Sequence, residues 1–144
     1  MILSDEEMAR RKAWLNRGFK AHRLAVAINA EINALLESAD GLRSSFNTGG
    51  GGNDTADSGN AGFVILVERI DDRRNKLIER LSEELDIKRE IEAVISQLDG
   101  RPEYGVLCMR CLSYQSWDSI ADAFGYSKRH LFRLYNSGVA RLVM

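Results

Sequence analysis

The sequence predicts an all-α protein, in which a long antiparallel helical hairpin is followed by a three-helix helix-turn-helix. Two observations carry this prediction. Across most of the first 100 residues, apolar side chains recur at steps of three and four, which is the period of an α-helix. The last forty residues hold shorter apolar stripes separated by turn residues. At 144 residues with 44% hydrophobic content, the chain can form one domain or two small ones, and we predict domains at 1–100 and 101–144.

The front helix is predicted from about Asp5 to Ser38. It opens with a capping box, in which Ser4 is followed three residues later by Glu7. Its apolar stripe alternates steps of four and three over more than three heptads, and Leu15, Leu24 and Leu36 widen it. The stripe consists of Trp14, Gly18, Ala21, Ala25, Ile28, Ile32, Leu35 and Ala39. We expect this helix to pack along a second one.

The helical period disappears at about residues 40–60, where a glycine tract at 49–52 precedes a run of small polar residues. This composition predicts a flexible loop that lets the chain reverse. The tract has no Gly-Lys-Ser or Gly-Lys-Thr ending and no preceding strand, so we do not expect it to bind a nucleotide phosphate.

A second long helix is predicted from about Ala61 to Leu98. Its apolar set is Val64, Val67, Ile70, Leu77, Leu81, Leu85, Ile91, Ile95 and Leu98. Arg74 and Lys88 interrupt the heptads, and polar seam residues tend to fix register or partner number. We therefore expect this hairpin to associate with a second copy of the chain as a homodimer. Gly100 and Pro102, the only proline, should end the helix.

The last part of the chain, from Glu103, has the pattern of a helix-turn-helix. Trp117, Ile120, Ala121 and Phe124 form one short helical stripe, and Gly125 follows where a helix would end in a left-handed residue. Ser127 can cap a second helix. The buried side of that helix would consist of Leu131, Leu134, Tyr135, Gly138, Val139 and Leu142. A small residue at Ala121 and a tight turn between the helices complete the motif.

The second helix of this motif begins with a cluster of basic residues. Lys128, Arg129, His130 and Arg133 lie in its first two turns and away from the apolar stripe. In a helix-turn-helix these turns contact base edges in the major groove, so we predict DNA binding here. The whole chain has a net charge of −1, but residues 101–144 have six Lys or Arg against three acids, which leaves −4 for the first 100. This asymmetry is typical of a protein with one DNA-facing end.

These residues resemble region four of bacterial sigma factors. The pattern is carried by Val106, Leu107 and Arg110 on a first helix, then Ile120-Ala121, Gly125-Tyr126-Ser127, Leu131 and Leu134. The whole chain is similar to small phage and prophage proteins of the ArpU and RinA type, through Ser116-Trp117, Gly125-Tyr126-Ser127 and Arg133-Leu134. The chain departs from the pattern at Gly138-Val139, where Ala-Leu is usual, and at Cys111-Leu112-Ser113, which replaces a Tyr-rich segment.

The resemblance implies a late-gene transcription regulator that binds double-stranded DNA. One helix-turn-helix with so few charges should bind weakly, so we expect either a dimer or recruitment by RNA polymerase to supply the rest of the affinity. The implied DNA contacts are Ser127, Lys128, Arg129, His130 and Arg133, with Ser116 and Arg110 supporting the turn or touching the DNA backbone. Two alternatives stay open. The chain can be a packaging protein like a terminase small subunit, or its tail can bind RNA polymerase without reading DNA.

Other classes of function find little support in the sequence. No apolar run approaches the roughly 20 residues needed to cross a membrane, so we expect a cytoplasmic protein of a bacterial host cell. Cys108 and Cys111 form a Cys-x-x-Cys, but His22 and His130 are too distant in sequence to suggest a zinc site, and packing is the expected role. The acids are scattered, so we expect no catalytic residues and no cofactor.

Overall fold

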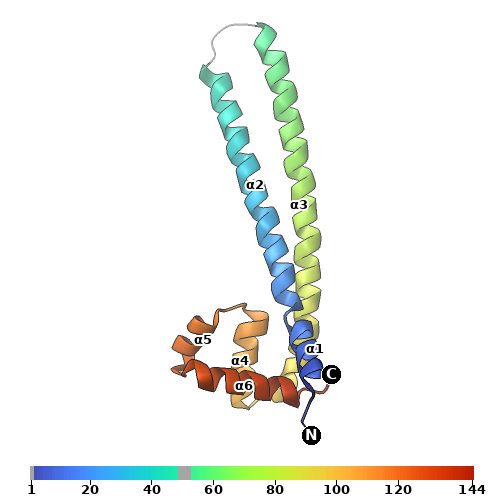
Figure 1. The fold of residues 1–144 in the computed structure, drawn as a ribbon. Coiled ribbons are helices and arrows are strands. Elements are labelled where there is room, and N and C mark those ends of the chain that lie inside the picture. The colour runs from blue at the N-terminus through green and yellow to red at the C-terminus, as the bar shows by residue number, and fades with distance from the viewer. Residues whose placement is uncertain (1, 49–52) are drawn as a thin grey trace. The chain divides into compact units, whose positions relative to one another are not determined.

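The computed structural model describes the backbone of residues 2–48 and 53–144, and the side chains of residues 2–42 and 61–144 (Figure 1). The α-helices are α1 (Asp5–Leu15), α2 (Arg17–Thr48), α3 (Asn53–Ile95), α4 (Pro102–Leu107), α5 (Trp117–Phe124) and α6 (Lys128–Arg141). A 3₁₀ turn at Ser96–Leu98 follows α3, and a π-helical turn at Cys108–Leu112 follows α4. The described residues contain no strand, which confirms the all-α prediction.

The chain forms two compact units. The tail unit comprises Met1–His22 and Glu83–Met144, and the hairpin unit comprises Arg23–Ser82. This division does not coincide with the predicted boundary at residue 100. The reason is that α1 and the last turns of α3 share their buried residues with α4, α5 and α6.

One continuous core holds the tail unit together. Helix α1 contributes Leu15, which is fully buried, and α3 contributes Ile91 and Ile95. The 3₁₀ turn adds Leu98. The helix-turn-helix supplies the rest of the core, namely Val106, Leu107, Cys111, Ile120, Ala121, Leu131, Leu134, Tyr135, Val139 and Leu142. Each large aliphatic side chain buried in this way stabilises the fold by about 1.5–3 kcal/mol relative to exposure. The helix-turn-helix is therefore built into a larger core, and α1 and α3 hold α6 in place.

The front helix is interrupted, whereas the sequence predicted a continuous helix from Asp5 to Ser38. Helix α1 ends at Leu15 and α2 begins at Arg17, with Asn16 between them at φ −88° and ψ 3°. The Arg17 Nε donates to the carbonyl of Trp14 across the break at 3.1 Å. On its side of the break, α1 packs against α6. Since the apolar stripe continues through Asn16, its period gave no sign of the break.

Helices α2 and α3 run antiparallel, as predicted. In the hairpin unit the Arg73 Nε lies 3.0 Å from an oxygen of Glu31, across the two helices. The predicted stripe of α2 is confirmed, because its residues are buried or half-buried throughout the described part. The predicted stripe of α3 is only partly confirmed. Ile70 is buried and Leu77 is half-buried, but the other four members within the hairpin unit or next to it are exposed, namely Val64, Val67, Leu81 and Leu85.

Helices occupy most of the segment 40–60, which the sequence predicted to be a flexible loop. Helix α2 extends to Thr48 and α3 begins at Asn53, while the glycine tract at 49–52 lies outside the described residues. The glycine, serine and aspartate content of this segment gives it low intrinsic helix propensity, which is why the sequence predicted a loop. Extending an existing helix by a residue is much easier than nucleating a new one, so two long neighbouring helices can continue into such a segment.

The junction between α3 and α4 forms as predicted. Gly100 adopts φ +88°, a left-handed conformation that glycine reaches without steric cost. Arg101 is extended, at φ −103° and ψ 152°, as the residue before a proline should be. Pro102 occupies the first turn of α4, where its missing N–H costs no hydrogen bond.

Candidate nucleic-acid interface

Two serine caps and one left-handed glycine set the turn between α5 and α6. The Ser116 Oγ accepts from the backbone N–H of Ser119 at 3.1 Å and begins α5. Gly125 ends α5 at φ 69°. The Ser127 Oγ then accepts from the backbone N–H of His130 at 3.2 Å and begins α6. Each cap contributes about 1 kcal/mol to its helix, so the sequence itself specifies where α6 starts.

One side of α6 is buried in the core of the tail unit. All six residues predicted for this side are buried, namely Leu131, Leu134, Tyr135, Gly138, Val139 and Leu142. Gly138 permits a close approach to α4, because a Cβ there would lie 3.0 Å from Glu103 Cβ and 3.0 Å from Leu107 Cδ1. Burial raises the pKa of the Tyr135 phenol to about 12, so Tyr135 stays neutral in the core. The rotation of α6 about its axis is therefore fixed.

The predicted basic residues lie on the opposite, exposed side of α6. Lys128, Arg129, His130 and Arg133 are all exposed. In the part of the chain that the structure describes, Arg129 and Arg133 have no ion-pair or hydrogen-bond partner. The Lys128 Nζ lies 2.6 Å from an oxygen of Asp118 on α5, so its charge is partly neutralised. This side of α6 therefore presents to an approaching anion two guanidinium groups, those of Arg129 and Arg133, that have no partner among the described residues.

Tyr126 and two residues further along α6 belong to this surface, although the sequence analysis gave them no role. The Tyr126 ring meets the His130 ring edge-on, with centroids 4.7 Å apart, and so orients the imidazole. Phe132 and Asn136 are exposed and share the helical face of Arg129 and Arg133, at spacings of three and four. The sequence could have identified these two residues. At the helical period, positions 129, 132, 133 and 136 lie together on the side opposite the predicted buried stripe.

Arg110 supports the turn in front of α5, which is one of the two roles predicted for it. Its guanidinium donates to the carbonyl of Gln115 at 2.9 Å and lies 4.5 Å from the centre of the Trp117 ring. Trp117 in turn meets Phe132 and Tyr135 edge-on, at centroid distances of 5.0 and 4.9 Å. Trp117 therefore packs against α6, as expected of a core anchor. Phe124 was predicted to be buried but is 39% exposed, because it lies at the rim beside Tyr126.

A polar cluster that the sequence did not predict holds the segment before α5. Tyr114 has φ 56°, an uncommon conformation for a residue with a side chain. Its hydroxyl donates to an oxygen of the buried Glu84 at 3.1 Å, and the His22 Nδ1 lies 3.2 Å from the same oxygen. Burial, together with the charge of Glu84, raises the pKa of the Tyr114 phenol. A Cβ at Gly18 would lie 3.1 Å from the Tyr114 hydroxyl oxygen, so glycine is needed there for close contact.

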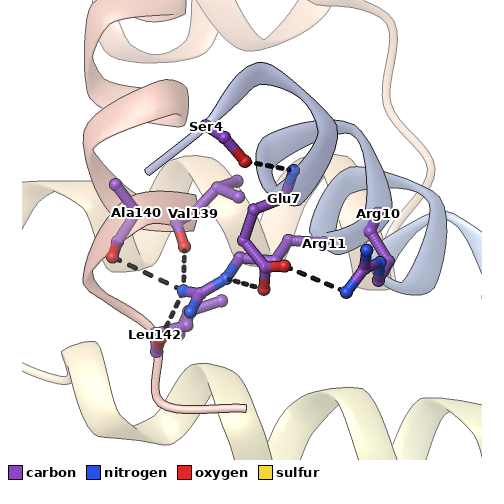
Figure 2. Close-up of polar contacts among 7 residues, drawn as sticks. All are labelled: Ser4, Glu7, Arg10, Arg11, Val139, Ala140 and Leu142. Carbon is purple, nitrogen blue, oxygen red and sulfur yellow. Dashed lines mark hydrogen bonds and ion pairs between the residues drawn. The ribbon is translucent and has the colours of Figure 1, made fainter. Parts of the chain in front are cut away.

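Helix α1 binds the carboxyl end of α6 through Arg11 (Figure 2). The Arg11 Nη1 donates to the carbonyl of Val139 at 3.1 Å, to that of Ala140 at 3.5 Å and to that of Leu142. Glu7 holds the same guanidinium from the other side, at 3.4 Å from Nε. The last carbonyls of a helix lack the usual hydrogen-bond donors within it and carry a partial negative charge. An arginine at this end donates hydrogen bonds to these carbonyls and brings a positive charge close to them.

The cysteines have the packing role expected of them. Cys111 is fully buried, and burial raises its pKa to about 12. Cys108 is half-buried, and burial also raises its pKa. In the described part of the chain, no three His, Cys, Asp or Glu side chains lie close enough together to hold a metal ion.

Comparison with known proteins identified no relative of this chain. No protein-family model, no curated protein and no solved structure matches the chain. Among the residues that the structure describes, no helix is both long enough and apolar enough to cross a membrane.

Proposed function

We propose that this protein is a sequence-specific DNA-binding regulator of transcription that places α6 in the major groove. One observation carries the proposal, namely the exposed basic face of the first two turns of α6, opposite a fully buried face. Arg129 and Arg133 have no partner among the described residues, so binding a phosphate or a guanine edge breaks no existing ion pair. A guanidinium that binds a guanine edge with two hydrogen bonds contributes about 1–3 kcal/mol of base discrimination.

The other predicted contacts fit the same docking of α6. Ser127 caps the helix and leaves its amino-terminal N–H groups and positive dipole end facing the DNA, where a phosphate oxygen can bind. His130 lies between this end and Arg133, held by Tyr126. Ser116 and Arg110 act indirectly in this proposal, because their polar atoms already bind within the turn.

The resemblance to ArpU and RinA type proteins supports late genes of a phage or prophage as the regulated genes. A single helix-turn-helix with this few charges should bind weakly on its own. We therefore include in the proposal a second DNA-binding copy or a contact with RNA polymerase, either of which raises the effective affinity.

A double substitution tests the proposal. We expect Arg129→Ala with Arg133→Ala to abolish the mobility shift of a duplex probe, because it removes the two guanidinium groups of the face that have no partner among the described residues. The matched control is Arg10→Ala with Arg101→Ala, which makes the same charge change near the other end of α6. Arg10 adjoins Arg11, which binds the last carbonyls of α6, and Arg101 lies two residues before Glu103, which contacts Ser137.

The control protein should shift the probe nearly as well as the unmodified chain. Equal losses in the two double variants would show that net charge, and not this face of α6, determines binding. Unchanged binding in both would contradict DNA readout by α6. Binding of RNA polymerase by the Arg129 and Arg133 variant, together with a lost mobility shift, is the expected pattern if both contacts exist.

A further inference from the structure

The hairpin unit has a second apolar stripe on α3 that no described residue covers. The stripe that faces α2 includes Ile70 and Leu77, and the second stripe lies one residue further along the chain. Its apolar members are exposed, Val64 by 53%, Val67 by 38%, Ile78 by 65% and Leu81 by 47%. They follow the steps of three and four that typify a helix packing seam. The two middle positions of this seam are Asp71 and Arg74.

The hairpin unit has few buried residues of its own. In its described part, only Ala25, Ile32 and Ile70 are buried hydrophobic residues. Two helices in contact along one narrow seam bury too little apolar surface to be very stable. Covering the second stripe would bury additional apolar surface and so stabilise the hairpin unit.

The second stripe has the same pattern of apolar and charged positions when it is followed from either end. Among the described side chains of the hairpin unit, which run from residue 61 to Ser82, its positions are 64, 67, 71, 74, 78 and 81, so the spacing is the same from either end. When two such helices lie antiparallel about a two-fold axis between residues 72 and 73, Val64 faces the partner's Leu81 and Val67 faces the partner's Ile78. Asp71 then faces the partner's Arg74, and Arg74 faces the partner's Asp71.

Charge complementarity selects this arrangement over the parallel one. In a parallel pair, Asp71 would face a second Asp71 and Arg74 a second Arg74, and both contacts are repulsive. Asp71 and Arg74 are exposed and have no ion-pair partner among the described residues, so both are available. The exposed stripe thus matches a reversed copy of itself in both apolar and charged positions.

A groove beside this stripe has room for the partner's side chains. It has a volume of about 210 Å³ and is lined by Leu36 and Ala39 of α2 and by Val67, Ile70, Asp71 and Arg74 of α3, among others. The groove lies at the level of Val67, which is where the partner's Ile78 is placed. Covering it would bury Leu36, which is 36% exposed.

We infer that the second stripe of α3 is the interface between two copies of this chain, which pair antiparallel through Val64, Val67, Asp71, Arg74, Ile78 and Leu81. The dimer has a four-helix core made of two α2–α3 hairpins. This inference depends on the hairpin unit alone and does not require that the protein bind DNA.

A matched pair of substitutions tests the position of the interface. Ile78 and Ile65 are both 65% exposed on α3, but Ile65 lies on the other side, beside Leu42 and Arg69. We expect Ile78→Ser to raise the dimer dissociation constant at least about a hundredfold, because two-fold symmetry removes the side chain twice. Ile65→Ser should leave it within about threefold of the original. The measurement is molar mass by light scattering of the full chain, without DNA.

Charge exchange tests the antiparallel register. We expect Asp71→Arg alone and Arg74→Asp alone to be monomers, since each places like charges opposite one another. Mixing these two variants should restore a dimer, because each Arg of one chain then faces an Asp of the other. Helical content by circular dichroism should be similar in all variants, since both positions are exposed. A monomeric unmodified chain, a dimer that Ile65→Ser disrupts as strongly as Ile78→Ser, or a mixture that stays monomeric would each overturn the inference.

Discussion

Replacing Arg11 with Ala should destabilise the tail unit far more than replacing its neighbour Arg10. Arg11 is 14% exposed in its side chain and donates to the carbonyls of Val139, Ala140 and Leu142 (Figure 2). A hydrogen bond from a charged donor contributes about 1.5–3 kcal/mol, and two of the three are well within bonding distance. Since water can reach part of the vacated site, we expect a loss of about 2–4 kcal/mol in the free energy of unfolding.

Arg10→Ala is the matched control. Arg10 binds the same Glu7 carboxylate at 3.1 Å, but its side chain is 74% exposed and does not reach α6. Exposed pairs of this kind contribute about 0.2–1 kcal/mol. Arg11→Lys should give an intermediate loss, because an ammonium keeps the charge but not the planar fork of donors.

Urea titration followed by tryptophan fluorescence measures this difference. Both tryptophans of the chain, Trp14 and Trp117, lie in the tail unit, so the signal reports the unfolding of that unit. Equal losses for Arg10→Ala and Arg11→Ala would refute the reasoning, because they would assign the effect to Glu7 and not to the end of α6.

Three further predictions concern an ion pair, two glycines and two buried ionisable groups. Asp118→Asn should release Lys128 and strengthen DNA binding by roughly threefold to tenfold at low salt in a mobility-shift titration, with a change in stability under about 1 kcal/mol. Gly62→Ala, where a Cβ would meet nothing within 4 Å, should stabilise α3 by up to about 1 kcal/mol in thermal melts, whereas Gly138→Ala should destabilise the tail unit by about 1–2 kcal/mol through its contacts at 3.0 Å. Unfolding free energy should fall between about pH 9 and pH 12, because Cys111 and Tyr135 ionise more readily in the unfolded chain than in the core. Tyr135→Phe should reduce the slope of that fall, and an unchanged slope would contradict the burial of this phenol.

Local signals in the sequence predicted the helix-turn-helix well. The cap at Ser127 and the left-handed Gly125 are properties of a few neighbouring residues, so the chain fixes them without help from distant parts. The cap at Ser116 is of the same local kind but was not predicted. The buried side of α6 followed from its period for the same reason. Its exposed face was identified less completely, since Asn136 and Phe132 were not assigned to it.

Features that depend on contacts between distant segments could not be predicted. Helix α1, which ends at Leu15, packs against α6 from the far end of the chain, and the bonds of Arg11 join residues about 130 positions apart. The cluster of Tyr114, Glu84 and His22 likewise joins three separate segments. The two stripes of α3 merged into one in the sequence, because stripes of the same period that are offset by a single residue cannot be separated without knowing which side of the helix faces α2.

Selection of bound duplexes from a random-sequence pool, at two salt concentrations, tests most directly whether the exposed face of α6 reads DNA. We expect one family of related sequences to be enriched, with an affinity that falls steeply as salt rises. In the variant lacking both Arg129 and Arg133, the enrichment should disappear, and the residual binding at low salt should have a logarithmic salt slope smaller by about 2. A pool that stays random, with the same salt slope in both proteins, would contradict the proposal.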